Sequence, residues 1–177
     1  MMLADLQASL GCQFRDERLL RQALTHRSFG IPNNERLEFL GDSVLNCVTA
    51  TLLYERLQDR KEGELSRLRA ALVCQGKLAE VARALGLGQY LRLGDGELKT
   101  GGANRPSILA DGLEAIIGAY YLDSGFEAAA TLVRGFFAPL VSEALALGDS
   151  RDAKTALQEA LQGRRLALPR YHLLSVR

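Results

Sequence analysis

Two acidic side chains lie one helical turn apart inside an apolar segment of the sequence. Glu38 and Asp42 occur in the stretch NERLEFLGDSVL, among Leu37, Leu40 and Val44. Positions four apart lie on nearly the same face of a helix, so both carboxylates border the side that packs. Carboxylates this close repel each other, and burial raises the cost, whereas a cation between them relieves both effects.

A second acidic pair follows in LADGLEAIIG, where Asp111 and Glu114 are three residues apart and again surrounded by apolar residues. If the two predicted helices cross, four carboxylates can converge. An all-oxygen cluster of this kind suits Mg²⁺ or Mn²⁺ better than zinc, and carboxylate-held metal ions support phosphodiester cleavage. An acidic pair is also typical of a solvated helix face, and spacing alone leaves both interpretations open.

These carboxylates must be positioned by helices, because the apolar residues recur with helical periodicity along most of the chain. Strand-like alternation is almost absent before residue 165. We expect Ser107, after Pro106, to cap one of these helices. The segments expected to be helical are residues 16–26, 35–58, 65–85, 107–125 and 126–147.

The C-terminal segment has a different character. GDSRDAKT, residues 148–155, is small and polar and indicates a linker; a short helix and one possible strand, RYHLLSVR, follow it. Basic residues outnumber acidic ones after residue 150, whereas the reverse holds before it. This asymmetry is a weak indication of a polyanionic partner, and a solvated tail explains it equally well.

Composition limits the class of protein. The chain has 177 residues, of which 47% are apolar and 24% charged, the balance of a globular domain of ordinary size. We expect no secretory signal and no membrane span, because no apolar run approaches the ~20 residues that a bilayer requires. The three cysteines are far apart and form no C-x-x-C motif, which favours a reducing compartment, the cytoplasm.

The sequence also resembles a known family. NERLEFLGDSVL is similar to the signature of bacterial ribonuclease III, and the similarity continues in the same order through ALTHRS, EGELSRLRAALV, LRLGDGELKTGG and SILADGLEAIIGAYYLDSG. It covers residues 3–147. The resemblance implies an all-α ribonuclease III endonuclease domain over residues 1–148. Residues 149–177 then form a linker and the N-terminal fragment of an incomplete α+β double-stranded-RNA-binding domain.

The resemblance implies a Mg²⁺-dependent endoribonuclease, with Mn²⁺ as a substitute, that acts as a homodimer on double-stranded RNA. Its products carry 5′-phosphate and 3′-hydroxyl ends, and its substrates are precursors of rRNA and mRNA. The alternative is a non-catalytic double-stranded-RNA-binding or assembly module on the same fold.

Motif positions of the family transfer to particular residues of this chain. The metal ligands would be Glu38, Asp42, Asp111 and Glu114, and of these Asp42 and Glu114 would be catalytic. Glu35 and Glu62 match acidic positions near the RNA and are secondary candidates, since both could equally be solvated charges at helix ends. Phe39 would anchor the dimer interface. One departure is Gly112, where the family more often has Ala; glycine inside a helix costs about 1 kcal/mol.

Overall fold

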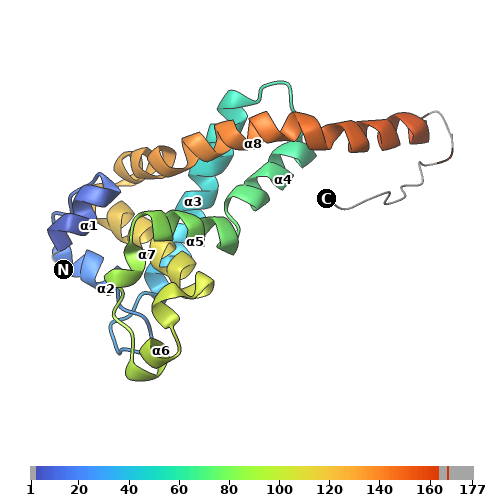
Figure 1. Ribbon diagram of the computed structural model, residues 1–177. Helices are drawn as coiled ribbons and strands as arrows, with labels where there is room; N and C mark the ends of the chain where they lie inside the picture. The colour runs from blue at the N-terminus through green and yellow to red at the C-terminus, as the bar shows by residue number, and fades with distance from the viewer. Residues whose placement is uncertain (1–2, 164–166, 168–177) are drawn as a thin grey trace. The chain divides into compact units, whose positions relative to one another are not determined.

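The chain folds into helices joined by short turns. The computed structural model describes residues 3–163 and 167, and within them the β-structure consists of one isolated parallel bridge between Thr25 and Arg92 (Figure 1). The predicted all-α fold class is therefore confirmed. The segments are α1 (Leu3–Leu10), α2 (Glu17–Ala23), α3 (Glu35–Arg56), α4 (Glu62–Leu72), α5 (Gln75–Ala84), η1 (Leu87–Gln89), α6 (Asp95–Lys99), η2 (Gly102–Asn104), α7 (Pro106–Ser124) and α8 (Phe126–Gly163).

Backbone contacts divide the chain into two units, Met1–Leu140 and Val141–Arg177. The first unit contains the hydrophobic core and all the acidic residues singled out above. None of the described helices is both long enough and apolar enough to cross a membrane.

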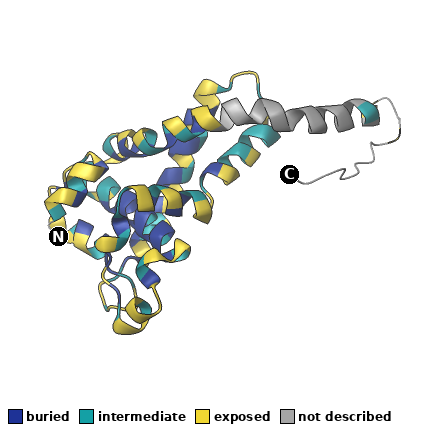
Figure 2. Ribbon diagram, in the orientation of Figure 1, coloured by how far each residue is buried: buried dark blue, intermediate teal, exposed yellow. Residues whose placement is uncertain are grey.

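Helix α7 lies at the centre of the first unit, packed against α2, α3 and α5. Apart from Asp111 and Glu114, its middle is apolar, which is the pattern of a buried helix rather than of a surface helix. Figure 2 shows the resulting concentration of buried positions on α7 and on the facing side of α3. The buried residues of α7 are Ile108, Leu109, Ala110, Gly112, Leu113, Ala115, Ile116, Ile117, Gly118 and Ala119.

Two glycines let α3 and α7 approach closely. A side-chain carbon added at Gly41 of α3 would overlap the carbonyl oxygen of Glu114, and one added at Gly118 of α7 would overlap the carbonyl oxygen of Leu37. Only residues without a Cβ allow the two backbones to come this near. The crossing therefore fixes the spacing between the helix that carries Glu38 and the helix that carries the second acidic pair.

The start of α7 corrects the predicted cap. Pro106 occupies the first turn and Arg105 is the N-cap residue, so Ser107 lies inside the helix instead of capping it. Proline suits this position because its fixed φ is already helical and its missing N–H would have no partner there. Gly112 does not interrupt α7: it is buried, and an added Cβ would lie 3.1 Å from Leu91 Cδ2.

Helix α8 corrects a second prediction. Residues 148–155, expected to form a linker, are helical and belong to α8, which continues to Gly163. The segment contains good helix formers such as Ala153 and Lys154, and a single Gly148 costs only about 1 kcal/mol against them. The domain boundary at residue 148 remains a prediction, and the possible strand at residues 170–177 lies outside the described residues.

Candidate metal centre and active site

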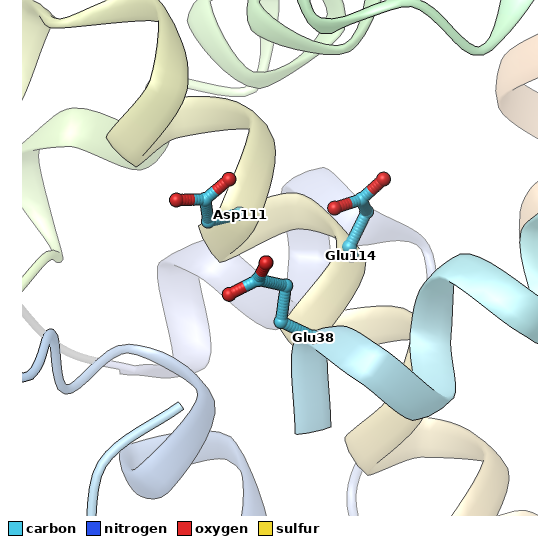
Figure 3. A group of neighbouring side chains, drawn as sticks. All are labelled: Glu38, Asp111 and Glu114. Atoms are coloured by element: carbon cyan, nitrogen blue, oxygen red, sulfur yellow. The ribbon is translucent and has the colours of Figure 1, made fainter. Parts of the chain in front are cut away.

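Three carboxylates converge where α3 crosses α7. Glu38 comes from α3, and Asp111 and Glu114 come from successive turns of α7 (Figure 3). One carboxylate oxygen from each residue can be chosen so that all three lie within 4.8 Å of one another. The i, i+3 spacing of the second pair and the close helix crossing together produce this arrangement, and its donors are all oxygen atoms, as Mg²⁺ and Mn²⁺ prefer.

Glu114 is the most strongly perturbed of these acids. Its pKa is raised from 4.5 to about 8, mainly by burial and further by the negative charges of Asp42, Glu38 and Asp111. A neutral carboxylic acid at physiological pH is a poor metal ligand. A divalent cation among these groups would reverse the effect, because positive charge favours the ionised form. The donor set therefore fits a cation in both chemistry and electrostatics.

Glu38 and Asp111 are also harder to ionise than usual. Burial is the main cause of the raised pKa of each, and Asp111 contributes further to that of Glu38. Two neighbouring basic residues oppose the increase: Arg27 lowers the pKa of both acids, and His26 lowers that of Asp111. The cluster is thus an acidic site with basic residues at its edge.

Asp42 lies beside the three converging acids. It is exposed, and it accepts a hydrogen bond of 2.8 Å from Asn46 Nδ2 on the next turn of α3. Its charge is near enough to raise the pKa of Glu114. The structure thus brings together three of the four predicted ligands, with the fourth at their border. The ligand roles of all four remain predictions.

A cavity of about 400 Å³ opens over Glu38 and Asp111. Glu35 lines this cavity. Its carboxylate accepts hydrogen bonds from Arg27 Nη1 at 3.4 Å and from Asn33 Nδ2 at 3.2 Å. The cavity walls thus combine acidic, basic and hydroxyl groups. Besides Glu38, Asp111 and Glu35, its lining consists of His26, Arg27, Asn34, Glu97, Arg105, Ser107 and Ile108.

Glu62 lies elsewhere in the monomer. It begins α4, accepts a hydrogen bond of 2.7 Å from Ser66 Oγ, and lines a different, largely apolar cavity together with Tyr54 and Leu65. The two secondary candidates are therefore separated: Glu35 borders the acidic cluster, whereas Glu62 does not line its cavity. A role for either residue in RNA contact remains a prediction.

Phe39 follows Glu38 in α3 but faces away from the core. Phe39 is 78% exposed in the second turn of α3, whereas the neighbouring Leu37 is buried. This exposure excludes the interpretation that Phe39 is a core residue on a wide apolar face. Its assignment to a dimer interface stays a prediction.

Sequence reasoning missed several residues that shape the site. Gly41 and Gly118 set the helix crossing, and Arg27 and Arg105 line the cavity. The glycines could have been found from their positions, since glycine inside a long helix needs a packing reason. The arginines gave no comparable signal, because the chain contains many Lys and Arg residues and their spacing relative to the acids is set only by the fold.

Comparison with known proteins agrees with this geometry. Residues 16–140 match the family model described as Ribonuclease-III-like. The chain belongs to the ribonuclease III family. The predicted family and enzyme class, an endoribonuclease, are therefore confirmed.

Individual members of the ribonuclease III family show how far the similarity extends. Ribonuclease 3 of Dechloromonas aromatica is 62% identical over 161 residues, which are 91% of this chain and 72% of that protein. Ribonuclease 3 of Aromatoleum aromaticum is 58% identical over 171 residues, 97% of this chain and 76% of that protein.

A solved ribonuclease III nuclease domain has the same fold. The structure from Campylobacter jejuni superposes with a TM-score of 0.75 at 46% sequence identity, covering 76% of this chain and 95% of that one. That work describes structural flexibility in a region of the nuclease domain involved in dimer formation.

Proposed function

We propose that this protein is a Mg²⁺-dependent endoribonuclease that cleaves double-stranded RNA. The observation that carries the proposal is the convergence of Glu38, Asp111 and Glu114 at the α3–α7 crossing, in a chain of the ribonuclease III family. Mg²⁺, or Mn²⁺ in its place, would activate water and stabilise the leaving oxygen when bound.

Each acid has a distinct part in this proposal. Glu38, Asp111 and Glu114 hold the cation, and the strong perturbation of Glu114 makes it the ligand most dependent on that cation. Asp42, more exposed and hydrogen-bonded to Asn46, completes the cluster and orients the attacking water. The oxygen of that water forms a bond to phosphorus while the bond from phosphorus to the 3′-oxygen breaks.

The attacking water loses one proton to solvent and the leaving 3′-oxygen takes up one from solvent to become a hydroxyl, while the phosphate stays on the 5′ end of the other fragment. The expected products are thus 5′-phosphate and 3′-hydroxyl ends. We propose precursors of rRNA and mRNA as the substrates, the cytoplasm as the compartment, and an enzyme that works as a homodimer. Duplex RNA is recognised mostly by shape and 2′-hydroxyl contacts, so little sequence preference is expected from this domain.

Dimer formation is supported by the exposed Phe39 and by the description of a dimer-forming region in the Campylobacter jejuni nuclease domain. A large aromatic side chain on an otherwise packed helix is a typical interface anchor. In a two-fold dimer the same residue would insert into the partner on both sides.

The alternative is a protein that binds duplex RNA without cutting it. Incubating the purified chain with long double-stranded and single-stranded RNA, with Mg²⁺ and with EDTA, separates the two functions. Cleavage of the duplex alone, and only with Mg²⁺, is the expected result. Binding without cleavage under every condition would support the non-catalytic module and overturn the proposal.

A further inference from the structure

Two arginines line the same cavity as the acidic cluster. Arg27 follows α2 in the loop that leads to α3, and Arg105 is the residue immediately before α7. Both lie in a cavity that also contains Glu38 and Asp111. An RNA strand that enters this cavity brings phosphates toward several carboxylates, so cationic groups are needed beside the cluster to offset that repulsion.

Each arginine is held by a glutamate outside the converging cluster. Arg105 Nη1 lies 2.8 Å from Glu97 Oε2, and its Nη2 donates to Thr100 Oγ1 at 3.1 Å. Arg27 Nη1 lies 3.4 Å from Glu35 Oε1. A guanidinium carries five N–H donors, more than these contacts use, so each arginine keeps donors for a phosphate while its position is fixed.

The loop that carries Arg27 is joined to the segment that leads into α6, the helix that carries Glu97, the ion-pair partner of Arg105. The backbone N–H of His26 donates a hydrogen bond to the Arg92 carbonyl at 3.0 Å, and the backbone N–H of Gly94 donates one to Ser28 Oγ at 3.0 Å. An added Cβ at Gly94 would overlap the Ser28 carbonyl, so the contact between the loops is close. These contacts connect the Arg27 loop to the base of α6, so Arg27 and Glu97, which both line the cavity, belong to connected segments.

We propose that Arg27 and Arg105 bind phosphates that neighbour the scissile phosphate on the same RNA strand. They would so position that strand over the carboxylates. This inference rests on the proposed function. Glu35 and Glu97 then serve as positioning residues that hold the two guanidinium groups. This gives Glu35 a role in RNA contact through Arg27.

The salt dependence of RNA binding tests this role directly. The logarithm of RNA affinity falls with the logarithm of salt concentration. Removing one arginine that binds a phosphate reduces the magnitude of this negative slope by about one. For each subunit that contacts the duplex, we expect Arg27→Gln and Arg105→Gln each to reduce the magnitude of the slope by about one, and the double variant by about two. Binding is measured by fluorescence anisotropy with a short blunt RNA duplex in EDTA, where no cleavage interferes.

A matched control comes from a similar ion pair away from the cavity. Arg134 Nη1 lies 2.8 Å from Glu55 Oε2 with comparable exposure, and Arg134→Gln should leave the slope unchanged. Arg105→Lys keeps the charge and should retain the wild-type slope. With Mg²⁺, Arg105→Gln should also raise KM more than it lowers kcat, because a phosphate contact acts on binding first.

The outcomes are separable. A double variant with the wild-type slope and an unchanged melting curve overturns the inference. If Arg105→Gln fails to fold, Arg27→Gln and Arg105→Lys provide the test. A less steep slope for Arg27→Gln together with a wild-type slope for Arg105→Lys supports the inference. A wild-type slope for Arg27→Gln overturns it. A wild-type protein that neither binds nor cuts duplex RNA would overturn the proposed function itself, whereas a cutting enzyme with unaffected variants overturns only the arginine assignment.

Discussion

Glu114 combines the deepest burial of the cluster with the largest electrostatic penalty for being ionised. Replacing it with Gln keeps the shape and removes both the charge and the carboxylate oxygen proposed to bind the cation. We expect Glu114→Gln to reduce duplex cleavage by at least about 100-fold, since even the loss of a residue that only supports a metal ligand costs about 10–100-fold. Duplex binding should persist. Cleavage and gel-shift assays on one preparation measure both.

Thermal melting tells a ligand role from a structural role at the same residue. Mg²⁺ should raise the melting temperature of the wild type, because a ligand that binds only the folded state stabilises it, and should raise that of Glu114→Gln much less. The exposed Glu80, paired with Lys77 on α5, provides the control substitution Glu80→Gln, which should change neither property. A collapsed melting temperature in Glu114→Gln without metal would instead identify a structural acid.

The raised pKa of Glu114 makes the metal-free protein sensitive to pH. The unfolded chain ionises this residue near pH 4.5, whereas the folded chain keeps the proton until about pH 8. The stabilising effect of the proton is complete below pH 4.5 and is lost as the pH rises through 8. We expect the free energy of unfolding, measured in EDTA, to fall over this interval, and to fall less in Glu114→Gln. Parallel pH profiles for the two proteins would contradict the burial of this group.

The closeness of α3 to α7 depends on two glycines, and it can be tested at one of them. In Gly41→Ala the new methyl group would overlap the Glu114 carbonyl, so the helices must separate. We expect a loss of about 1–3 kcal/mol in the free energy of unfolding, the usual cost of overpacking. Cleavage should also fall in the fraction that folds, because the carboxylates of the two helices move apart. Urea unfolding and a cleavage assay measure the two effects.

Gly135 gives the matched control in α8. It lies inside a helix, it is exposed, and an added Cβ would meet no atom within 4 Å. Gly135→Ala should therefore stabilise the protein by about 0.5–1 kcal/mol. Equal effects of the two substitutions would show that helix propensity, and not the crossing, determines the result at Gly41.

Periodicity was sufficient to predict the helices that build this site. The apolar spacing around Leu37 and Leu113 placed both acidic pairs on helices, and the ends of α3 and α7 fall within two residues of the expected positions. The sequence pattern could not predict that the helices cross at the acids. That depends on contact between Gly41 and Gly118, which are far apart in the chain.

Other differences have equally local causes. Asp42 shares a helix face with Glu38, yet it accepts a hydrogen bond from Asn46 and lies at the border of the cluster. Periodicity predicts the shared face but not the direction in which the Asp42 side chain turns. Residues 148–155 have the polarity of a linker, but their helix-forming residues continue α8. In both cases the residue types were compatible with two structures: the hydrogen bond from Asn46 accompanies the border position of Asp42, and helix propensity favours the continuation of α8.

At the scale of the whole molecule, Phe39 provides the test of assembly. We expect Phe39→Ala to shift the protein from dimer toward monomer with its helix content retained, since truncation of a central aromatic anchor commonly costs at least about 2 kcal/mol of binding energy. Sedimentation velocity measures the shift, and circular dichroism checks the fold. The exposed Phe126, at the start of α8, is the control: Phe126→Ala should leave the dimer intact. An unchanged dimer in Phe39→Ala would refute the interface assignment.

The α3–α7 crossing at the two glycines also makes the acidic cluster transferable to another protein. The residues that bring the helices together, Gly41 and Gly118, lie within one or two turns of Glu38 and Glu114 on the same two helices. A designer could therefore graft two short helical segments, residues 37–45 and 108–118, into an unrelated helical bundle. The transferred segments would contain both the carboxylates and the glycines that set the spacing between the two backbones.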